Sequence, residues 1–296
     1  MKVLAIIVSY NFERWIDRCL PTLLVSEEPV DILVIDNCST DDTVERIKRM
    51  YPSVRLLVNE HNLGFGKANN IGLSLAIDEH YEYVFLINQD AWVSRVSIGN
   101  MIKAAESEQM KAVISPVHLN GAGEQLDHGF ATYINKTSIW EVYEQRDTIQ
   151  VDFINAAFWF IPIDIVKRVG GFSPLFYHYG EDKDYANRLK FHHYAFGYTS
   201  SATGYHDRAY RISSFIDIER AEYVYFLSEY ANINYTLGKA FLKSIIASTF
   251  KGLKCLFKAD WQMALAYYKM AFKLLCNTAA VRRIRKQTKK EGRSFI

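Results

Sequence analysis

The first 90 residues alternate apolar runs with amphipathic segments, and this alternation limits the possible folds more than any other feature. The apolar runs predict strands at 3–10, 30–37, 54–60 and 81–90. The segments between them predict helices at 12–25, 41–51 and 66–80. Strands that are apolar along their whole length are typical of a parallel sheet with helices on both faces, so we predict an α/β fold.

Each of these predicted strands ends in polar residues. Ligands of open parallel sheets bind beyond the carboxyl ends of the strands. An aspartate there can hydrogen-bond a ribose or ligate a cation on a phosphate, although it can also cap the next helix. Four polar exits on one edge favour a ligand site. They are Ser9, Tyr10 and Asn11; Asp36 and Asn37; residues 59–66, with Asn62 and Gly64; and Asn88, Gln89 and Asp90.

The stretch NLGFGKANNIG, residues 62–72, contains Gly64 and Gly66 but has Asn69 where a dinucleotide-binding fingerprint needs a third glycine. That fingerprint also belongs after the first strand, so we do not predict a dehydrogenase. Two interpretations remain open. The stretch is either a plain turn into a helix or a set of backbone amides and asparagines that faces a nucleotide.

A cluster of acids opens the segment GEDKDYANRL, residues 180–189. Acids as close as Glu181, Asp182 and Asp184 raise one another's pKa and can supply a general base. They are equally favoured at a helix start by the helix dipole. His206, in GYHD, stands alone, and a lone histidine is more often structural than a ligand. The residue pattern alone leaves these alternatives open.

Charge is unevenly distributed along the chain. Residues 239–296 hold 14 Lys and Arg against two acids, a net charge of +12, whereas residues 1–238 hold 21 against 31, a net charge of −10. Lysines and apolar residues at helical spacing predict a basic amphipathic helical region over 219–296, behind a separate domain over 1–218. Such helices suit an anionic membrane surface. Packing on the catalytic body is the alternative, and no nucleic-acid-binding motif is present.

The sequence also suggests a compartment. No run reaches the roughly 18–20 apolar residues that span a bilayer. The apolar start is not followed by a small-residue cleavage site, and the four cysteines show neither metal-binding nor disulfide spacing. We expect a cytoplasmic protein that is peripheral on the inner face of the plasma membrane.

Taken in order, several stretches are specific as a set. They are IIVSYN, ILVIDNCSTDDT, NEHNLGFGKANNIG, FLINQDAWV, FINAAFWFIPIDIVKRVGGFSPLFYHYGEDKDYANRL and GYHD. In these stretches the chain resembles the inverting family-two glycosyltransferases of the GT-A fold, and most closely their bacterial rhamnosyltransferase-like branch. The likeness covers about residues 3–208, roughly two-thirds of the chain.

The resemblance implies a fold and a metal site. The fold is GT-A, a Rossmann-like mixed sheet flanked by helices, here with a C-terminal helical extension. The metal would be Mg²⁺ or Mn²⁺ on the donor diphosphate, held by Asp90. His206 falls where the family often completes the metal or diphosphate site. Asn88 stands where a first aspartate often sits, so this site has one charge fewer.

The resemblance also implies roles at the donor and the acceptor. Asp36 would contact the nucleoside, and Asp182 would be the catalytic base. Asn155, Trp159 and Glu181 are expected at the acceptor, although residues 158–160 read equally well as a core strand. The residues expected at the donor are Ser9, Tyr10, Asn11, Asp36, Asn37, Asn62, Gly64, Asn88, Gln89 and Arg188.

The resulting expectation is a metal-dependent inverting glycosyltransferase of bacterial surface polysaccharide synthesis. Its partners would be a nucleotide-sugar donor, a glycan or polyprenyl-linked acceptor and the membrane surface, with no nucleic acid. The branch suggests dTDP-rhamnose as the donor, with UDP-galactofuranose or a UDP-hexose as alternatives. A nucleotidyltransferase would need a Gly-rich basic loop after the first strand, and VSYNFERW has none. A non-catalytic carbohydrate-binding scaffold is the remaining alternative.

Overall fold

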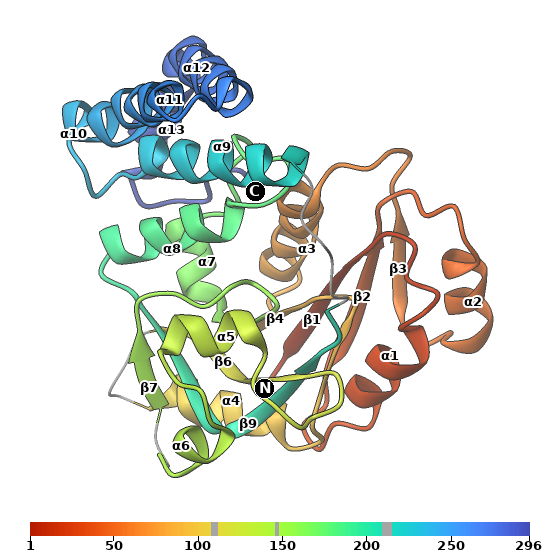
Figure 1. Ribbon diagram of the computed structural model, residues 1–296. Helices are drawn as coiled ribbons and strands as arrows, with labels where there is room; N and C mark the ends of the chain where they lie inside the picture. Colours follow the sequence, from red (N-terminus) through yellow and green to blue (C-terminus); the bar gives the residue numbers. More distant parts are fainter. Residues whose placement is uncertain (108–111, 146–147, 209–214) are drawn as a thin grey trace.

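A computed structural model describes residues 1–107, 112–145, 148–208 and 215–296. Within these residues nine strands form one mixed sheet, in the order β3-β2-β1-β4-β8-β6-β9-β5, with β7 also paired to β9 (Figure 1). The strands are β1 Val3–Ser9, β2 Asp31–Asp36, β3 Arg55–Val58, β4 Tyr83–Ile87, β5 Ala91–Val93, β6 Ala112–Asn120, β7 Thr148–Val151, β8 Phe158–Pro162 and β9 Ala195–His206.

Parallel pairing joins β1 to both β2 and β4, and joins β2 to β3. This half of the sheet is the one that the alternating sequence predicts. Beyond β4 the pairing becomes mixed, because β8 runs antiparallel to β4 and to β6, whereas β9 runs parallel to β6. The predicted mixed sheet with flanking helices is confirmed.

Helices cover both faces of the sheet and continue beyond it. Those that accompany the sheet are α1 Ile16–Leu24, α2 Thr43–Met50, α3 Phe65–Asp78, α4 Ser97–Glu106, α5 His128–Ile134, α6 Ile139–Tyr143, α7 Ile163–Val169 and α8 Glu181–Phe191. The C-terminal helices are α9 Phe215–Ala231, α10 Leu237–Phe241, the π-helical turn η1 Leu242–Ile246, α11 Ala247–Phe257, α12 Trp261–Cys276 and α13 Thr278–Thr288.

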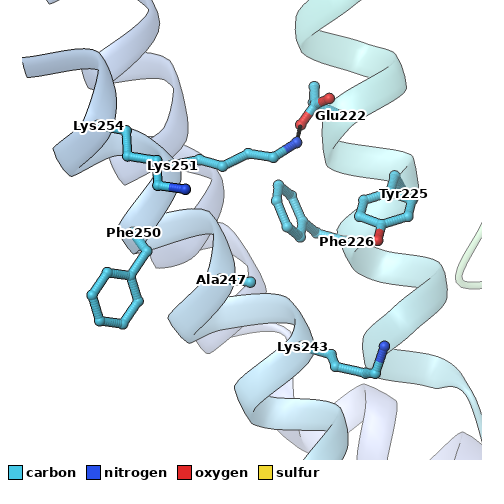
Figure 2. A pocket seen from close by; sticks show the side chains of 8 residues that line it. All are labelled: Glu222, Tyr225, Phe226, Lys243, Ala247, Phe250, Lys251 and Lys254. Atoms are coloured by element: carbon cyan, nitrogen blue, oxygen red, sulfur yellow. Dashed lines mark hydrogen bonds and ion pairs between the residues drawn. The ribbon is translucent and has the colours of Figure 1, made fainter. Parts of the chain in front are cut away.

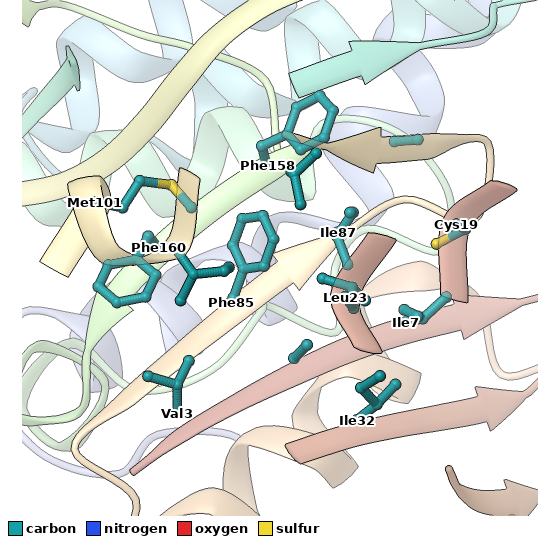
Figure 3. Close-up of a cluster of buried hydrophobic side chains, with 14 of the residues drawn as sticks. Val3, Ile7, Cys19, Leu23, Ile32, Phe85, Ile87, Met101, Phe158 and Phe160 are labelled. Carbon is teal, nitrogen blue, oxygen red and sulfur yellow. The ribbon is translucent and has the colours of Figure 1, made fainter. Parts of the chain in front are cut away.

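Alternation along the strands divides the core between the two faces. Ile7 of β1 points into the cluster that α1 and α4 cover, whereas Ile6 points into the cluster on the opposite face. Figure 3 shows Ile7 with Cys19, Phe85 and other members of the first cluster. Because successive side chains of a strand point to opposite faces, a strand buried on both sides is apolar throughout.

The C-terminal helices have a hydrophobic cluster of their own, in which Phe226, Met270 and Leu274 are buried. Figure 1 shows α9–α13, coloured cyan to blue, grouped beside α8. The last residues then return to the end of α7, where the Gly171 amide donates to the Ser294 carbonyl at 2.8 Å. The predicted boundary between residues 218 and 219 falls inside α9, and the division into two domains remains a prediction.

Candidate active site

Two adjoining cavities open at the carboxyl edge of the parallel strands. The first, of about 860 Å³, follows the ends of β1, β2 and β4, and the second, of about 430 Å³, lies toward α8 and β9. Both are lined by Asp90 and Asn88, so the two cavities meet at the exit of β4. The sequence-predicted residues that line the first cavity are Ser9, Tyr10, Asn37, Asn62, Gly64, Asn88, Gln89 and Asp90.

At the exits of β1 and β2, Asp36 joins two loops. Its carboxylate accepts hydrogen bonds from the Ser9 hydroxyl at 2.9 Å, from the Ser39 amide at 2.9 Å and from the Ser39 hydroxyl. Nearby, Asn11 braces the same loop by accepting from the Thr40 amide at 2.9 Å. Asp36 is fully buried and does not itself line the first cavity, whereas its partner Ser9 and its neighbour Asn37 do. A contact between Asp36 and the nucleoside therefore remains a prediction, and in the structure its bonds shape the floor of the cavity.

Gln89 fixes the backbone of Tyr10 at the cavity rim. Its side-chain oxygen accepts from the Tyr10 amide at 2.8 Å, and its side-chain nitrogen donates to the Tyr10 carbonyl at 3.1 Å. This two-way pair resembles the bonding between neighbouring strands and extends the β1–β4 contact beyond the end of the sheet. Tyr10 itself remains 47% exposed and lines the first cavity.

Gly64 begins α3 at a point where only glycine fits. Its φ angle of +79° is in the left-handed region, and a Cβ atom there would lie 2.2 Å from the Tyr177 carbonyl oxygen. The Asn62 side chain accepts from the Gly64 amide at 2.9 Å, and the Tyr177 hydroxyl donates to the Asn62 carbonyl at 3.1 Å. Gly64 therefore permits the backbone of Tyr177, which lines the first cavity, to approach the start of α3 closely.

His206 lies between two carboxylates. Its Nε2 is 3.3 Å from Asp90 Oδ1, and its Nδ1 is 3.6 Å from Asp127 Oδ2. The register that pairs Ala91 with His206 across β5 and β9 makes the first contact possible. Burial lowers the pKa of His206, but hydrogen bonds to Asp127 and Asp90 outweigh it and raise the pKa overall.

Sequence reasoning missed Asp127. It caps α5 by accepting from the Phe130 amide at 3.0 Å, and Arg208 lies 3.4 Å from its carboxylate. Burial acts to raise the pKa of Asp127, yet its bonds to His206 and Phe130 and the Arg208 charge lower it overall. The signal in the sequence, an aspartate before a short helix, is a common cap and does not indicate His206 as a partner.

Asp90 and His206 could bind a divalent cation only if a substrate supplied further ligands. In the described parts of the chain no three His, Cys, Asp or Glu side chains gather to hold a metal. Asp90 and His206 nevertheless offer two ligand atoms 3.3 Å apart, close to the roughly 3 Å between adjacent ligands of an octahedral Mg²⁺. Asp127 would orient the imidazole from behind. Such a site takes its remaining ligands from phosphates and water.

The acids that open α8 differ from one another. Asp182 lines the second cavity and accepts from the Lys183 amide at 2.7 Å, and burial raises its pKa. Glu181 is 6% exposed, and its Oε2 has no hydrogen-bond partner within the described chain. Burial and the neighbouring Asp182 charge raise the pKa of Glu181 to about 8. Asn155 lines the same cavity, and its Oδ1 is likewise buried without a partner among the described residues.

Two predicted site residues lie elsewhere, which corrects the sequence interpretation. Arg188 is buried, pairs with Asp184 at 2.9 Å and donates to the carbonyls of Val169 and Gly171. Its donors are occupied by α8 and the end of α7, so we withdraw it from the donor set. Trp159 is fully buried in β8 and donates to the Ile154 carbonyl at 3.0 Å, as the core-strand alternative requires.

A half-parallel sheet with this pair of cavities at its carboxyl edge is the architecture of a GT-A glycosyltransferase. The family model described as glycosyl transferase family 2 matches residues 4–170. The match covers more than half of the 296 residues, and the chain belongs to this family. It is therefore a transferase that uses a nucleotide-sugar donor.

Curated relatives are similar over most of the chain. An N-acetylglucosaminyl-diphospho-decaprenol L-rhamnosyltransferase of Mycobacterium tuberculosis is 25% identical over 230 residues, which cover 69% of this chain and 75% of that protein. The rhamnosyltransferase WbbL of Escherichia coli is 26% identical over 204 residues, covering 63% of this chain and 76% of WbbL. The predicted likeness to a rhamnosyltransferase-like branch is confirmed.

Solved structures share the fold at low identity. Residues 1–349 of TarS from S. aureus, in complex with UDP, superpose with a TM-score of 0.56 at 16% identity, covering 98% of this chain and 90% of that one. A mannosyltransferase from Pyrobaculum calidifontis, in complex with GDP-Man and Mn²⁺, gives a TM-score of 0.58 at 17% identity, covering 97% and 82%. These structures support the GT-A fold.

Proposed function

We propose that the chain is an inverting glycosyltransferase that moves a rhamnosyl group from dTDP-rhamnose to a glycan or polyprenyl-linked acceptor in bacterial surface polysaccharide synthesis. The observation that carries this proposal is the position of Asp182 in the second cavity, which meets the first at Asp90. A donor in the first cavity would place its sugar at this junction. The names of the mycobacterial and E. coli relatives support the rhamnosyl group and, for the former, a polyprenyl-linked acceptor.

Asp182 is the proposed general base. It takes the proton of an acceptor hydroxyl as that oxygen attacks the anomeric carbon, while the bond to the diphosphate oxygen breaks on the opposite side. The nucleoside diphosphate leaves with the bonding electrons, and the configuration inverts. A pKa raised by burial makes Asp182 a better proton acceptor than an exposed aspartate.

The neighbouring residues orient the acceptor. Glu181 and Asn155 each hold a buried oxygen without a partner in the described structure, and both line the cavity of Asp182. Below a pH of about 8, Glu181 is protonated and can donate a hydrogen bond to a sugar hydroxyl. Asn155 Oδ1 can accept one. A bound acceptor would satisfy both groups, which otherwise remain desolvated at a cost.

Asp90 and His206 would hold Mg²⁺ or Mn²⁺. A divalent cation there supplies electrostatic stabilisation to the diphosphate as negative charge develops on it. Arg208 Nε, which donates to His206 Nδ1 at 3.3 Å, and Asp127 Oδ2, 3.6 Å from the same nitrogen, keep the His206 ring in place. The Asn88 side chain at the same strand end as Asp90 lines both cavities.

The C-terminal helices are proposed to lie on an anionic membrane. In the described residues no helix is both long and apolar enough to cross a bilayer. Several large apolar side chains are nevertheless exposed on α11 and α12: Phe250 (59%), Phe257 (84%), Trp261 (70%) and Phe272 (69%). Exposed aromatics beside lysines are typical of helices that lie in the interfacial plane.

Vesicle binding tests the membrane contact. The chain is expected to sediment with vesicles that contain anionic phosphatidylglycerol and to bind neutral phosphatidylcholine vesicles weakly. A Phe257→Ser, Trp261→Ser variant should lose most of this binding and keep its melting temperature, because both side chains are exposed. Equal binding by the variant would contradict the proposed surface.

Ligand-induced stabilisation tests the donor. Melting temperatures are measured with dTDP, UDP, GDP and CDP, each with and without Mn²⁺, since a ligand that binds only the folded state stabilises it. A Mn²⁺-dependent increase with dTDP alone, lost in Asp90→Ala, supports the proposal. An increase with UDP alone would keep the enzyme class and change the donor to a UDP-sugar. No increase with any nucleotide would favour the non-catalytic scaffold.

A further inference from the structure

The C-terminal helices form one wall of the first cavity. Side chains from this region line it opposite the strand ends. The polar ones are Arg220 and Tyr223 of α9, Lys273 of α12 and Asn277 just after α12, and Val224 and Leu227 of α9 add apolar surface. We propose that Arg220 and Lys273 bind the diphosphate of the nucleotide sugar, so that α9 and α12 complete the donor site. This inference rests on the proposed function and names residues that the family-matching region, 4–170, does not contain.

The charges around this cavity suit an anion. Arg220 and Lys273 are the only Lys or Arg side chains among the described residues that line it, and Asp90 is the only carboxylate. Neither cation is paired with a carboxylate in the described part of the chain. A nucleoside diphosphate is strongly negative, and Arg and Lys are the side chains that bind phosphate oxygens most strongly. The two cations therefore outweigh the repulsion from Asp90.

Packing positions Lys273 in this wall. Its Nζ lies 4.2 Å from the centre of the Tyr223 ring, within the range of a cation–π contact. The Tyr223 hydroxyl in turn accepts a hydrogen bond from the Asn277 side chain at 3.0 Å. These two contacts fix the Tyr223 ring of α9 against the end of α12. They hold the Lys273 ammonium group near the cavity and leave its positive charge unpaired by any carboxylate in the described residues.

A second basic hollow provides the contrast. It lies between α9 and the segment from η1 to α11, and Figure 2 shows Lys243, Lys251 and Lys254 around it. Lys251 already pairs with Glu222 at 2.7 Å, and Lys243 pairs with Glu229 at 3.4 Å. An anion there would have to compete with carboxylates. Among the described residues no ion pair joins a carboxylate to Arg220 or Lys273, and this difference favours them as the diphosphate site.

Arg220 and Lys273 take the place of Arg188, the cation that the sequence analysis expected at the donor. Arg188 is engaged with Asp184 and two backbone carbonyls inside the core. Arg208 lines the second cavity, near Asp127. The positive charge available to the donor cavity therefore comes from helices far along the chain, beyond the motif-bearing region.

Titration calorimetry of Arg220→Ala, Lys273→Ala and the double variant tests this inference. The ligands are dTDP and thymidine, with UDP and uridine as a second pair. Lys269→Ala is the matched control, because Lys269 is exposed on α12 and does not line the cavity. Loss of one charged contact to a phosphate is expected to weaken diphosphate binding about tenfold per variant. Nucleoside binding should change less than about twofold, and Lys273→Arg should retain most of the affinity.

Three results would overturn the inference. If the double variant binds the diphosphate as tightly as Lys269→Ala does, the two cations do not contact it. An equal loss of nucleoside and diphosphate affinity would mean that the wall acts only through packing. If the unaltered chain binds neither dTDP nor UDP, the proposed function itself fails, and this inference fails with it.

Discussion

The two cavities of the cleft differ in how their polar side chains are partnered. In the first, Gln89 is bonded twice to Tyr10, and Asn37 accepts from the Asn59 side chain at 2.9 Å. In the second, Asn155 and Glu181 bury oxygens without partners in the described chain. The first cavity is thus shaped before a ligand arrives, whereas the second keeps unsatisfied groups that a substrate would satisfy. We associate the first with donor binding and the second with the chemistry.

Asp182→Asn should have the largest effect and should affect only the second cavity. Removing a general base lowers kcat about 10²- to 10⁴-fold, because an amide cannot take the proton. Donor affinity should stay within about twofold, since Asp182 does not line the first cavity. Steady-state kinetics with dTDP-rhamnose give kcat, and calorimetry with dTDP gives the affinity. A parallel loss of both would remove the distinction between the cavities.

Gly64→Ala should distort the first cavity and lower both stability and donor affinity. The new Cβ would meet the Tyr177 carbonyl, and a positive φ strains alanine, so the free energy of unfolding should fall by about 1–3 kcal/mol. Donor affinity should fall as well, because Tyr177 and its neighbours line this cavity. Gly238→Ala is the control, since nothing lies within 4 Å of a Cβ there. Chemical denaturation measures the stability, and a variant as stable as the control would contradict the close approach.

The raised pKa of Glu181, in the second cavity, should make the free energy of unfolding depend on pH. Its pKa rises from 4.5 to about 8 in the folded chain, so between these pH values the folded state binds more protons at Glu181 than the unfolded state does. Stability from this group is complete below pH 4.5 and is lost as the pH rises through about 8. Glu181→Gln should flatten the fall in unfolding free energy over this window. Denaturation at several pH values measures it, and an unchanged slope in the variant would contradict the raised pKa.

Gln89→Leu should have the smallest effect and should be confined to the first cavity. It removes both bonds to the Tyr10 backbone, which in a partly exposed place contribute about 1 kcal/mol to donor binding. The Kd for dTDP should rise about fivefold, with kcat unchanged at saturating donor. A change in kcat with Kd constant would assign Gln89 to the chemistry and weaken the comparison.

Much of the parallel half of the sheet could be predicted from the sequence. The apolar runs locate β1, β2, β3 and β4 to within about two residues at most ends, because local periodicity determines them. The polar exits of these strands converge on one cavity, as parallel strands require. Neither result needs information from distant parts of the chain.

The rest depended on long-range pairing. β9 lies between β6 and β5, and only this register brings His206 to Asp90 and Asp127. The wall formed by α9 and α12 likewise follows from tertiary packing, which no local pattern in the tail reveals. Arg188 carried a local signal that the sequence interpretation missed, since it lies four residues after Asp184 on one helix, the spacing of an intrahelical ion pair.

The most direct test of the whole account is the anomeric configuration of the product formed from dTDP-rhamnose, read by NMR from the one-bond carbon–hydrogen coupling of the new glycoside. The account predicts a configuration opposite to that of the donor, because the acceptor oxygen, deprotonated by Asp182, attacks in one displacement. A product that retains the donor's configuration would require a second displacement or a covalent intermediate, and would contradict Asp182 as the base of a single inverting step.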